Sequence, residues 1–375
     1  MDTITQGLLG AVTAQLGFRQ RLGPRATWAA AAAAVAPDLD VFIVPLMELT
    51  GAETEFMAVS RYHRGISHSL FAVPVIAAAA AGVWWLLGRR ARRRARANPP
   101  LEPPAPDGAA PQRGPPGFGW LLACCFVAVL SHPLLDWCTS YGTQILLPLT
   151  DTRYAIDAAP IIDLIYTPIL IVTLVACWAV RKIKPDPRRA SLAVGWAGFA
   201  LSVAYLATGR VLHDAAVARA RQLASGATIV RADAYPAIGT IFLWRTVVET
   251  DRDWRVTRLR PLQPLPAEKL RSDTAPKIDN AWIRRAADLP AVRTFRWFAM
   301  GRARAAYEVV DARHVITFHD MRYGFPLESA DSMWALRVEF DAAGKAVHVA
   351  SQRRHGRRGG FRRAIRRSWD DLWAP

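Results

Sequence analysis

Apolar runs about as long as a lipid bilayer is thick constrain the fold of this chain more than any other feature. Ser69–Gly88 is almost entirely apolar over 20 residues, and a transmembrane helix needs about 20 such residues. Comparable runs follow at Gly117–Ser131, Ile161–Val180 and Ser191–Thr208. Two shorter segments, Ile4–Phe18 and Trp28–Ala36, fall short of a full span and are predicted to form a partly inserted hairpin.

Clusters of basic residues alternate with these runs and predict an orientation in the membrane. The basic clusters lie at 19–25, 89–96 and 181–189. Loops rich in lysine and arginine stay on the cytoplasmic side. Clusters of histidine and aspartate lie at the opposite ends of the apolar runs, at 37–40, 63–68 and 131–163. The sequence therefore predicts one composite site on the extracytoplasmic face of the membrane.

The composition supports a membrane protein and weighs against a nucleic-acid-binding protein. The chain is 52% hydrophobic and has a net charge of +17, a combination typical of apolar spans joined by basic loops. A strong basic excess also occurs in nucleic-acid-binding proteins, but no nucleic-acid motif accompanies it here. We expect membrane lipids as partners and no nucleic acid. The eight arginines of Arg353–Arg367 are interpreted as a tail facing solvent or lipid headgroups.

Ionisable side chains follow directly after the apolar run that ends at Ser131. His132 and Asp136 are four residues apart, so on a helix they project from one face. An imidazole and a carboxylate in that arrangement can bind one metal ion, although Pro133 removes a backbone donor and can kink or start the helix. The alternative is a histidine and an aspartate that hydrogen-bond each other inside a bundle. The same stretch contains Arg153, Asp157 and Asp163, and ionisable groups near hydrocarbon usually mark a functional site.

Two further clusters carry groups that bind metals. Asp38 and Asp40 follow the alanine-rich segment, where aspartate is unfavourable for the helix dipole, and this misfit favours a role in a site. His63 and His68 stand on either side of Gly65, which suits a turn that aims both imidazoles at one point. A single surface histidine is usually a satisfied polar group, whereas this pair indicates metal ligation.

The chain changes character after Arg210. Residues 211–375 contain no apolar run long enough to span a membrane, and segments rich in β-branched and aromatic residues predict strands. These segments are Thr228–Val230, Thr240–Glu249, Trp254–Leu259, Ala306–Val310, His314–His319, Met333–Phe340 and Ala346–Ala350. We therefore predict a membrane domain over 1–210, with an arginine- and proline-rich linker at 89–116. A smaller soluble α+β or mostly β domain over 211–375 is predicted to lie on the extracytoplasmic side.

Several motifs resemble those of one known family. They are Asp2–Gln6, Pro37–Asp40, His63–Ser69, His132–Asp136, Ser140–Thr143, Ile161–Asp163, Tyr166–Thr167, Leu243–Arg245 and Asp320–Gly324. In these residues the chain resembles the YdjM-like membrane-bound metal-dependent hydrolases of bacterial inner membranes. That group is distantly similar to zinc-dependent phospholipases C, a fold-level analogy. The family's opening motif commonly has histidine where this chain has Gln6, and an amide is a much poorer ligand for zinc than an imidazole.

The residues and the resemblance together predict a metal-dependent hydrolase that acts on a phosphoester or lipid-related substrate. The predicted ligands of a divalent ion, with zinc preferred, are Asp38, Asp40, His63, His68, His132 and Asp136. The predicted catalytic residues are Asp40, Arg64, Arg153 and Asp163. A bound ion lowers the pKa of a water molecule towards about 7, and the two guanidinium groups are matched to an anionic small-molecule or lipid substrate.

Two other hypotheses remain open at this point. A degenerate site that has lost one ligand at Gln6 would serve structure or partner regulation without catalysis. A transporter would instead carry its polar residues at the centres of its spans, whereas here they cluster at the ends of the spans.

Overall fold

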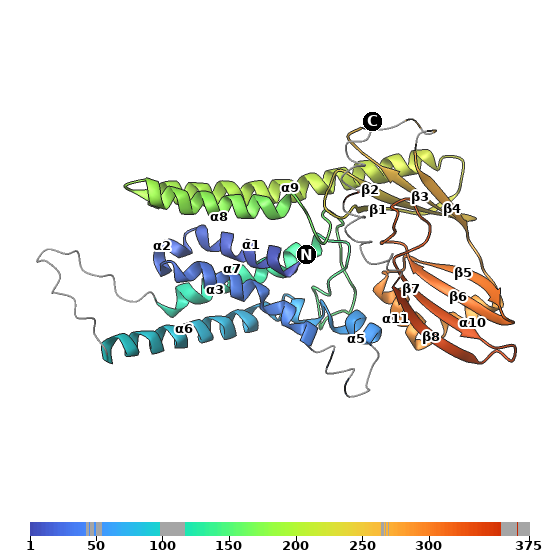
Figure 1. Cartoon of the computed structure of the whole chain (residues 1–375), viewed down its shortest axis with the longest axis horizontal. Helices are drawn as coiled ribbons and strands as arrows, with labels where there is room; N and C mark the ends of the chain where they lie inside the picture. Colours follow the sequence, from blue (N-terminus) through green and yellow to red (C-terminus); the bar gives the residue numbers. More distant parts are fainter. Residues whose placement is uncertain are drawn as a thin grey trace, which may run out of the picture.

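The computed structural model describes residues 1–42, 45, 49, 55–97, 117–263, 266, 268, 270–353 and 366. Residues 98–116 of the predicted linker, and the arginine-rich tail beyond Arg353 except for residue 366, lie outside the described residues. The described chain forms a helical N-terminal part followed by a part built on two β-sheets (Figure 1). This order confirms the predicted fold class.

The N-terminal part consists of helices joined by short turns. Its α-helices are α1 (Thr3–Gln15), α2 (Phe18–Leu22), α3 (Arg25–Val35), α5 (Glu55–Tyr62), α6 (Val73–Ala97), α7 (Phe118–Trp137), α8 (Tyr166–Ile183) and α9 (Pro187–Leu223). Two short 3-10 helices carry polar motifs, η1 (Ala36–Phe42) and η2 (Ile66–His68). Both lie at turns between longer helices, so their side chains are free to face the interior of the bundle.

Three of these helices, α7, α8 and α9, are long and apolar enough to cross a membrane. A fourth candidate is the pair Val59–His68 and Val73–Arg94, which bends by 73°. Helix α6 continues through the arginine cluster to Ala97, because arginine is a good helix former. The first nine residues of the predicted linker, 89–97, are therefore helical.

The predicted N-terminal hairpin forms by close packing of α1 on α3. Alanines line both helices, and Gly10 permits the contact, because a Cβ atom there would lie 2.4 Å from Ala34 Cβ and 2.6 Å from Ala30 O. Helix α7 packs beside this pair, and α8 lies along α9 (Figure 1). The close approach brings the end of α3, and with it η1, against α7.

The C-terminal part contains two antiparallel four-stranded sheets. The first sheet holds β1 (Ile229–Pro236), β2 (Trp244–Thr250), β3 (Asp253–Leu259) and β4 (Ser272–Pro276). The second holds β5 (Ala303–Val310), β6 (Arg313–Asp320), β7 (Trp334–Phe340) and β8 (Ala346–Arg353). Helices α10 (Ala281–Ala287) and α11 (Pro290–Phe298) connect the sheets. Each predicted strand segment overlaps one of these strands; β4 was not predicted, because its exposed sequence SDTAP lacks apolar alternation.

The two parts are joined by a continuous helix and by hydrogen bonds from the buried Arg322. Helix α9 runs across residue 210, the predicted domain boundary, and its last turns pack on the first sheet through Ala220 and Ala224. Arg322 forms a fully buried ion pair with Asp320 at 2.6 Å. Its Nη1 donates to the carbonyl oxygens of Ser140 and Tyr141 at 3.1 and 2.9 Å. The β-rich part is thereby attached to the loop that follows α7.

Candidate metal centre

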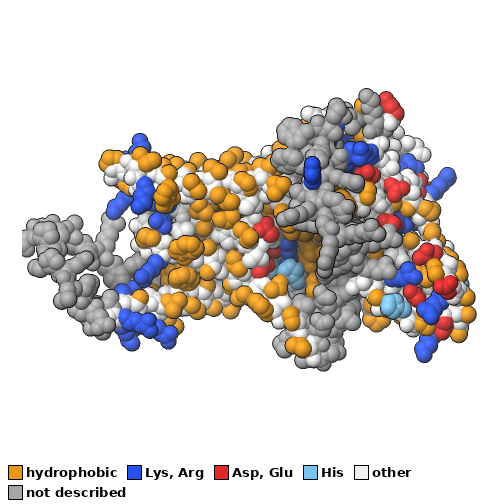
Figure 2. Space-filling model, in the orientation of Figure 1, with side chains coloured by type: hydrophobic (Ala, Val, Ile, Leu, Met, Phe, Trp, Pro, Cys, Tyr) orange, Lys and Arg blue, Asp and Glu red, His pale blue; other side chains and the backbone are white. Residues whose placement is uncertain are grey.

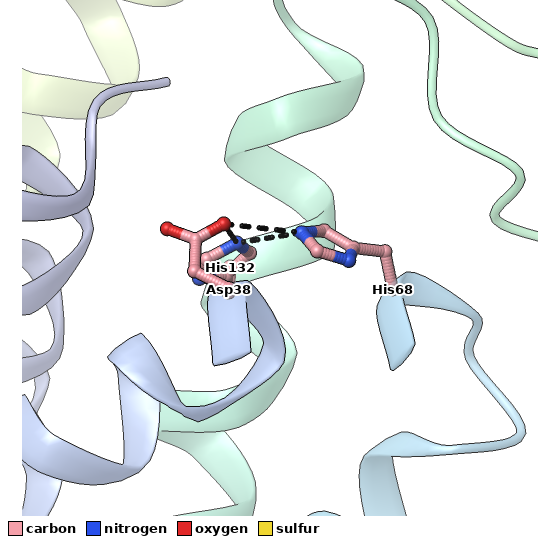
Figure 3. Close-up of side chains that lie close together, drawn as sticks. All are labelled: Asp38, His68 and His132. Atoms are coloured by element: carbon pink, nitrogen blue, oxygen red, sulfur yellow. Dashed lines mark hydrogen bonds and ion pairs between the residues drawn. The ribbon is translucent and has the colours of Figure 1, made fainter. Parts of the chain in front are cut away.

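Three segments that are distant in the sequence bring their polar side chains to one point. Asp38 comes from η1, His68 from η2 and His132 from the last turns of α7 (Figure 3). One ligand atom from each of the three lies within 4.8 Å of the other two. All three positions are largely or fully buried. The predicted HRGISHS turn and the predicted α7 face therefore meet at the PDLD motif.

The distances extend this group to Asp136. The Nε2 atoms of His68 and His132 are 3.0 Å apart, and they lie 3.4 and 3.3 Å from Asp38 Oδ1. Asp136 Oδ2 lies 3.3 Å from His68 Nε2 and 3.5 Å from His132 Nε2. We call Asp38, His68, His132 and Asp136 the His/Asp cluster.

The contacts of the two outer ring nitrogens, His68 Nδ1 and His132 Nδ1, orient both imidazoles so that Nε2 faces the cluster. His132 Nδ1 lies 2.5 Å from the carbonyl oxygen of Ala34, which can only accept, so the ring proton is on Nδ1. His68 Nδ1 lies 3.2 Å from Asp40 Oδ2 and 2.9 Å from Ser67 Oγ. In the neutral rings both Nε2 atoms would then direct lone pairs inward, the arrangement in which a second acceptor orients metal-binding histidines.

This donor set fits a divalent cation. With both rings neutral, two imidazole lone pairs and two carboxylates would face one another without hydrogens between them, which is unfavourable unless a positive charge lies there. Asp136 Oδ2 is buried and has no hydrogen-bond partner in the described part of the chain. Nitrogen and oxygen ligands in these numbers suit zinc and related transition metals. The residues that would hold the ion are the four of the His/Asp cluster.

Asp40 and His63, both predicted ligands, lie one layer outside the cluster. Asp40 uses Oδ1 for His63 Nδ1 at 3.0 Å and Oδ2 for His68 Nδ1 at 3.2 Å. Ser67 Oγ donates to the same Oδ2 at 2.8 Å. The side chain of His63 is 22% exposed. Asp40 therefore links a partly exposed histidine to a buried one.

Hydrogen bonds keep the two η1 carboxylates ionised. Burial alone raises the pKa of Asp38 and Asp40, but hydrogen bonds with the facing imidazoles outweigh it and hold both pKa values well below the usual range. For Asp38 the imidazoles are those of His132 and His68; for Asp40 they are those of His63 and His68. Both side chains are thus anionic at neutral pH.

The second oxygen of Asp136 is neutralised by protein groups. Its Oδ1 lies 3.1 Å from Arg64 Nη2 and accepts from Gln6 Nε2 at 3.0 Å; the Met1 amino group also contacts it. Arg64 is buried, and its Nη1 donates to Thr139 Oγ1 at 2.8 Å. Gln6 therefore acts here as a hydrogen-bond donor to a ligand carboxylate, on the side of Asp136 away from the imidazoles.

Arg153 and Asp163, predicted to be catalytic, have partners elsewhere. Arg153 is buried and donates to the carbonyl oxygens of Gly142, Ser60 and His63 at 2.6–3.1 Å, so it connects the loop after α7 to the turn after α5. Asp163 Oδ1 accepts from the backbone amides of Ile165 and Tyr166 at 2.8 and 2.9 Å. These contacts stabilise the start of α8.

Two hydroxyl groups of the site were not predicted as site residues. Thr3 Oγ1 donates to Asp38 Oδ2 at 2.7 Å, and Ser67 contacts both Asp40 and His68. Each lies in a motif noted from the sequence, DTITQ and HRGISHS. The sequence feature that could have indicated Thr3 and Ser67 is that each lies within one of these motifs.

Comparison with known proteins agrees with this geometry. The family model described as "YdjM inner membrane protein" matches residues 1–213, which include every residue of the His/Asp cluster and more than half of the chain. No curated protein and no solved structure matches the chain. The chain is therefore a multi-span inner-membrane protein that belongs to the YdjM family of membrane-bound metal-dependent hydrolases.

Proposed function

We propose that this protein is a metal-dependent hydrolase that cleaves a phosphoester at the outer surface of the inner membrane, with zinc as the preferred ion. The observation that carries the proposal is the inward convergence of Asp38, His68, His132 and Asp136, with Asp136 Oδ2 buried and without a hydrogen-bond partner among the described residues. A divalent ion held there would supply Lewis acidity and an activated water molecule.

The surrounding residues have distinct tasks in this proposal. Ser67 and Asp40 hold the ring of His68 with Nε2 inward, and a hydrogen bond of this kind also raises the basicity of the ligand. His63 is partly exposed and bonded to Asp40 through Nδ1. Its other ring nitrogen is free to exchange a proton with substrate or solvent, so His63 is our candidate general acid or base.

Charge balance favours a single ion. Within the described site, Asp38, Asp40 and Asp136 bring three negative charges, and Arg64 and the Met1 amino group bring positive charge to Asp136. One divalent cation would bring this set close to neutrality, as a buried site requires. Gln6 occupies the side of Asp136 opposite the imidazoles, where it takes the place of a further ligand.

The proposed orientation rests on the separation of charge along the bundle. Lysine and arginine side chains gather at the end of the bundle that is far from the β-rich part (Figure 2). That end carries α2 and the turn between α8 and α9, whereas the N-terminus lies near the other end (Figure 1). The positive-inside rule then assigns the basic end to the cytoplasm and the His/Asp cluster, with the β-rich part, to the extracytoplasmic side.

The direct test is metal analysis of the purified protein in detergent, together with hydrolysis of bis(p-nitrophenyl) phosphate. We expect about one zinc or manganese per chain, and loss of both metal and hydrolysis in His132→Ala and Asp136→Asn. His348→Ala is the matched control, because His348 is exposed on β8. Full metal content and unchanged hydrolysis in the two cluster variants would contradict the proposal.

The alternative is a non-catalytic protein that keeps the ion for structure. Gln6 favours it, because the amide fills a position that could have supplied another ligand. The same experiment separates the two functions. A structural ion predicts metal in the wild type, no hydrolysis of the phosphodiester, and loss of the protein from the membrane in His132→Ala. A catalytic ion predicts normal accumulation of that variant.

A further inference from the structure

A pocket of about 580 Å³ lies between the membrane part and the β-rich part, directly beside the candidate metal centre. Asp40 and Ser67 line it, and both contact His68. Helix α11 supplies another wall through Arg293 and Trp297. The pocket therefore begins one side chain away from the His/Asp cluster and is completed by a helix outside the residues that match the family model.

The walls of this pocket are mostly apolar, with charge at separate positions. Ile66 and Leu147 line it from the membrane part. Trp297 is held in place by a hydrogen bond from Nε1 to the carbonyl oxygen of Asp151 at 3.2 Å and by the Arg153 guanidinium 4.9 Å from its ring centre. A concave, apolar pocket with a few polar groups is the usual form of a site for an organic ligand.

The charged side chains that line the pocket differ in their hydrogen bonds and ion pairs. Both carboxylate oxygens of Asp40 are engaged by contacts with His63, His68 and Ser67. Arg293 is exposed on α11 and makes no ion pair with any residue of the described chain. Asp151 and Arg61 also line the pocket. Arg293 is thus the cation best placed to meet an anionic ligand.

The segments that form the membrane-side wall also expose large apolar side chains. Leu39 and Phe42 of η1 are 57% and 69% exposed, Phe71 after η2 is 50% exposed, and Leu149 beside Leu147 is 74% exposed. Large exposed apolar side chains of this kind mark surfaces that contact lipid or another apolar partner. A ligand with an apolar tail can therefore reach the pocket from the bilayer.

We propose that this pocket binds a phosphoester that carries an acyl or similar hydrocarbon tail and comes from the outer leaflet. This inference rests on the proposed hydrolase function and names its substrate class. The phosphate lies towards Asp40 and His68, Arg293 contacts the anionic headgroup, and the tail lies along Ile66 and Leu147. Helix α11 makes the β-rich part a determinant of substrate specificity.

The test measures binding and hydrolysis separately, with full-length protein in phosphatidylcholine nanodiscs. The probes are a dihexanoyl phosphonate analogue of phosphatidic acid, which a phosphoester hydrolase does not cleave, and the tail-less glycerol phosphonate. We expect the tailed probe to bind at least about tenfold more tightly, because its apolar tail leaves water. Hydrolysis of bis(p-nitrophenyl) phosphate reports the metal centre independently of the tail.

Two exposed positions supply the variants. Arg293→Ala and Ile66→Asn should each weaken binding of the tailed probe by about tenfold while metal content stays at the wild-type level. Arg296→Ala is the matched control, since Arg296 is exposed on the same helix and does not line the pocket. Equal affinity of the wild type for both probes, or equal losses in Arg293→Ala and Arg296→Ala, would overturn the inference. A wild type without metal or hydrolysis that still binds the tailed probe through Arg293 would refute only the hydrolase.

Discussion

The His/Asp cluster and the Asp320–Arg322 pair are both buried groups of charged side chains, yet their hydrogen bonding differs. Arg322 donates through Nε and Nη2 to Asp320, and through Nη1 to two carbonyl oxygens. In the cluster, two imidazole nitrogens and two carboxylates face each other, and Asp136 Oδ2 lacks a donor among the described groups. The pair is complete within the protein, whereas the cluster contains a buried carboxylate oxygen without a donor among the described residues. Burial of charge alone therefore does not identify a functional site; the balance of donors and acceptors does.

The largest expected effect on stability is at the Asp320–Arg322 ion pair. Arg322→Ala leaves the Asp320 carboxylate buried without its cation, and breaking a buried ion pair in this way costs about 3–5 kcal/mol. We expect little folded protein in the membrane. The double variant Asp320→Asn/Arg322→Met removes both charges and should restore part of the lost accumulation, measured by fluorescence-detection size-exclusion chromatography. Equal loss in the single and double variants would show that the pair contributes through shape rather than charge.

Metal removal sharpens the same comparison at the cluster. If an ion completes it, chelation with EDTA removes a ligand that stabilises only the folded state, a loss of about 2.7 kcal/mol for an ion present at 100 times its dissociation constant. We expect the thermal midpoint of the wild type to fall in EDTA and to recover on addition of zinc. The midpoint of Asp136→Asn should respond less, while Arg322→Lys, if it folds, should keep the full response. An EDTA response of equal size in Asp136→Asn would place the ion elsewhere.

The sequence indicated where the cluster forms but not how its members divide their roles. The spacing of His132 and Asp136 on one helical face, and the histidines around Gly65, predicted side chains that the structure brings together. Spacing does not specify which of two aspartates in a 3-10 turn faces inward. Asp38 reaches the inner nitrogens of both imidazoles, whereas Asp40, two residues later, reaches the outer nitrogen of His68. That division depends on the packing of α3 against α7, a tertiary contact.

The roles of the arginines were still less accessible from the sequence. Arg153 and Arg64 are both in polar stretches, and both were predicted to meet an anionic substrate. In the structure Arg64 contacts a carboxylate of the cluster, and Arg153 donates to backbone carbonyls. Their partners come from loops whose conformation no helical or strand periodicity describes. The β-rich part was more predictable, because its strands are rich in β-branched and aromatic residues and buried residues alternate with partly exposed ones in β3.

An outer hydrogen bond should have a smaller effect than the ion itself. Asp40→Asn keeps the shape of the side chain but removes the charge that orients His68. Loss of such a partner typically lowers metal affinity by about 10–100-fold. We expect this loss in zinc competition titrations with a chromophoric chelator, with normal accumulation of the protein. Asp151→Asn, which changes an exposed carboxylate that lines the adjacent pocket, should leave zinc affinity unchanged; an equal loss there would assign the effect to general electrostatics.

The smallest expected effect is at Asp157, a buried carboxylate in the loop between α7 and α8. Burial raises the pKa of Asp157 above the ordinary value, and its Oδ1 has no hydrogen-bond partner in the described chain. The backbone φ of 53° at this position is one that asparagine adopts readily. A carboxyl whose folded pKa is raised gives full stability below the unfolded pKa of about 3.9 and loses it as pH rises through the folded pKa. Asp157→Asn should therefore stabilise the protein at pH 7 by about 0.5–2 kcal/mol and less at pH 4. The measurement is the thermal midpoint of the wild type and of Asp157→Asn at pH 7 and at pH 4. A variant that is less stable than the wild type at pH 7 would mean that the ionised carboxylate has a favourable partner, as Asp136 has in Arg64.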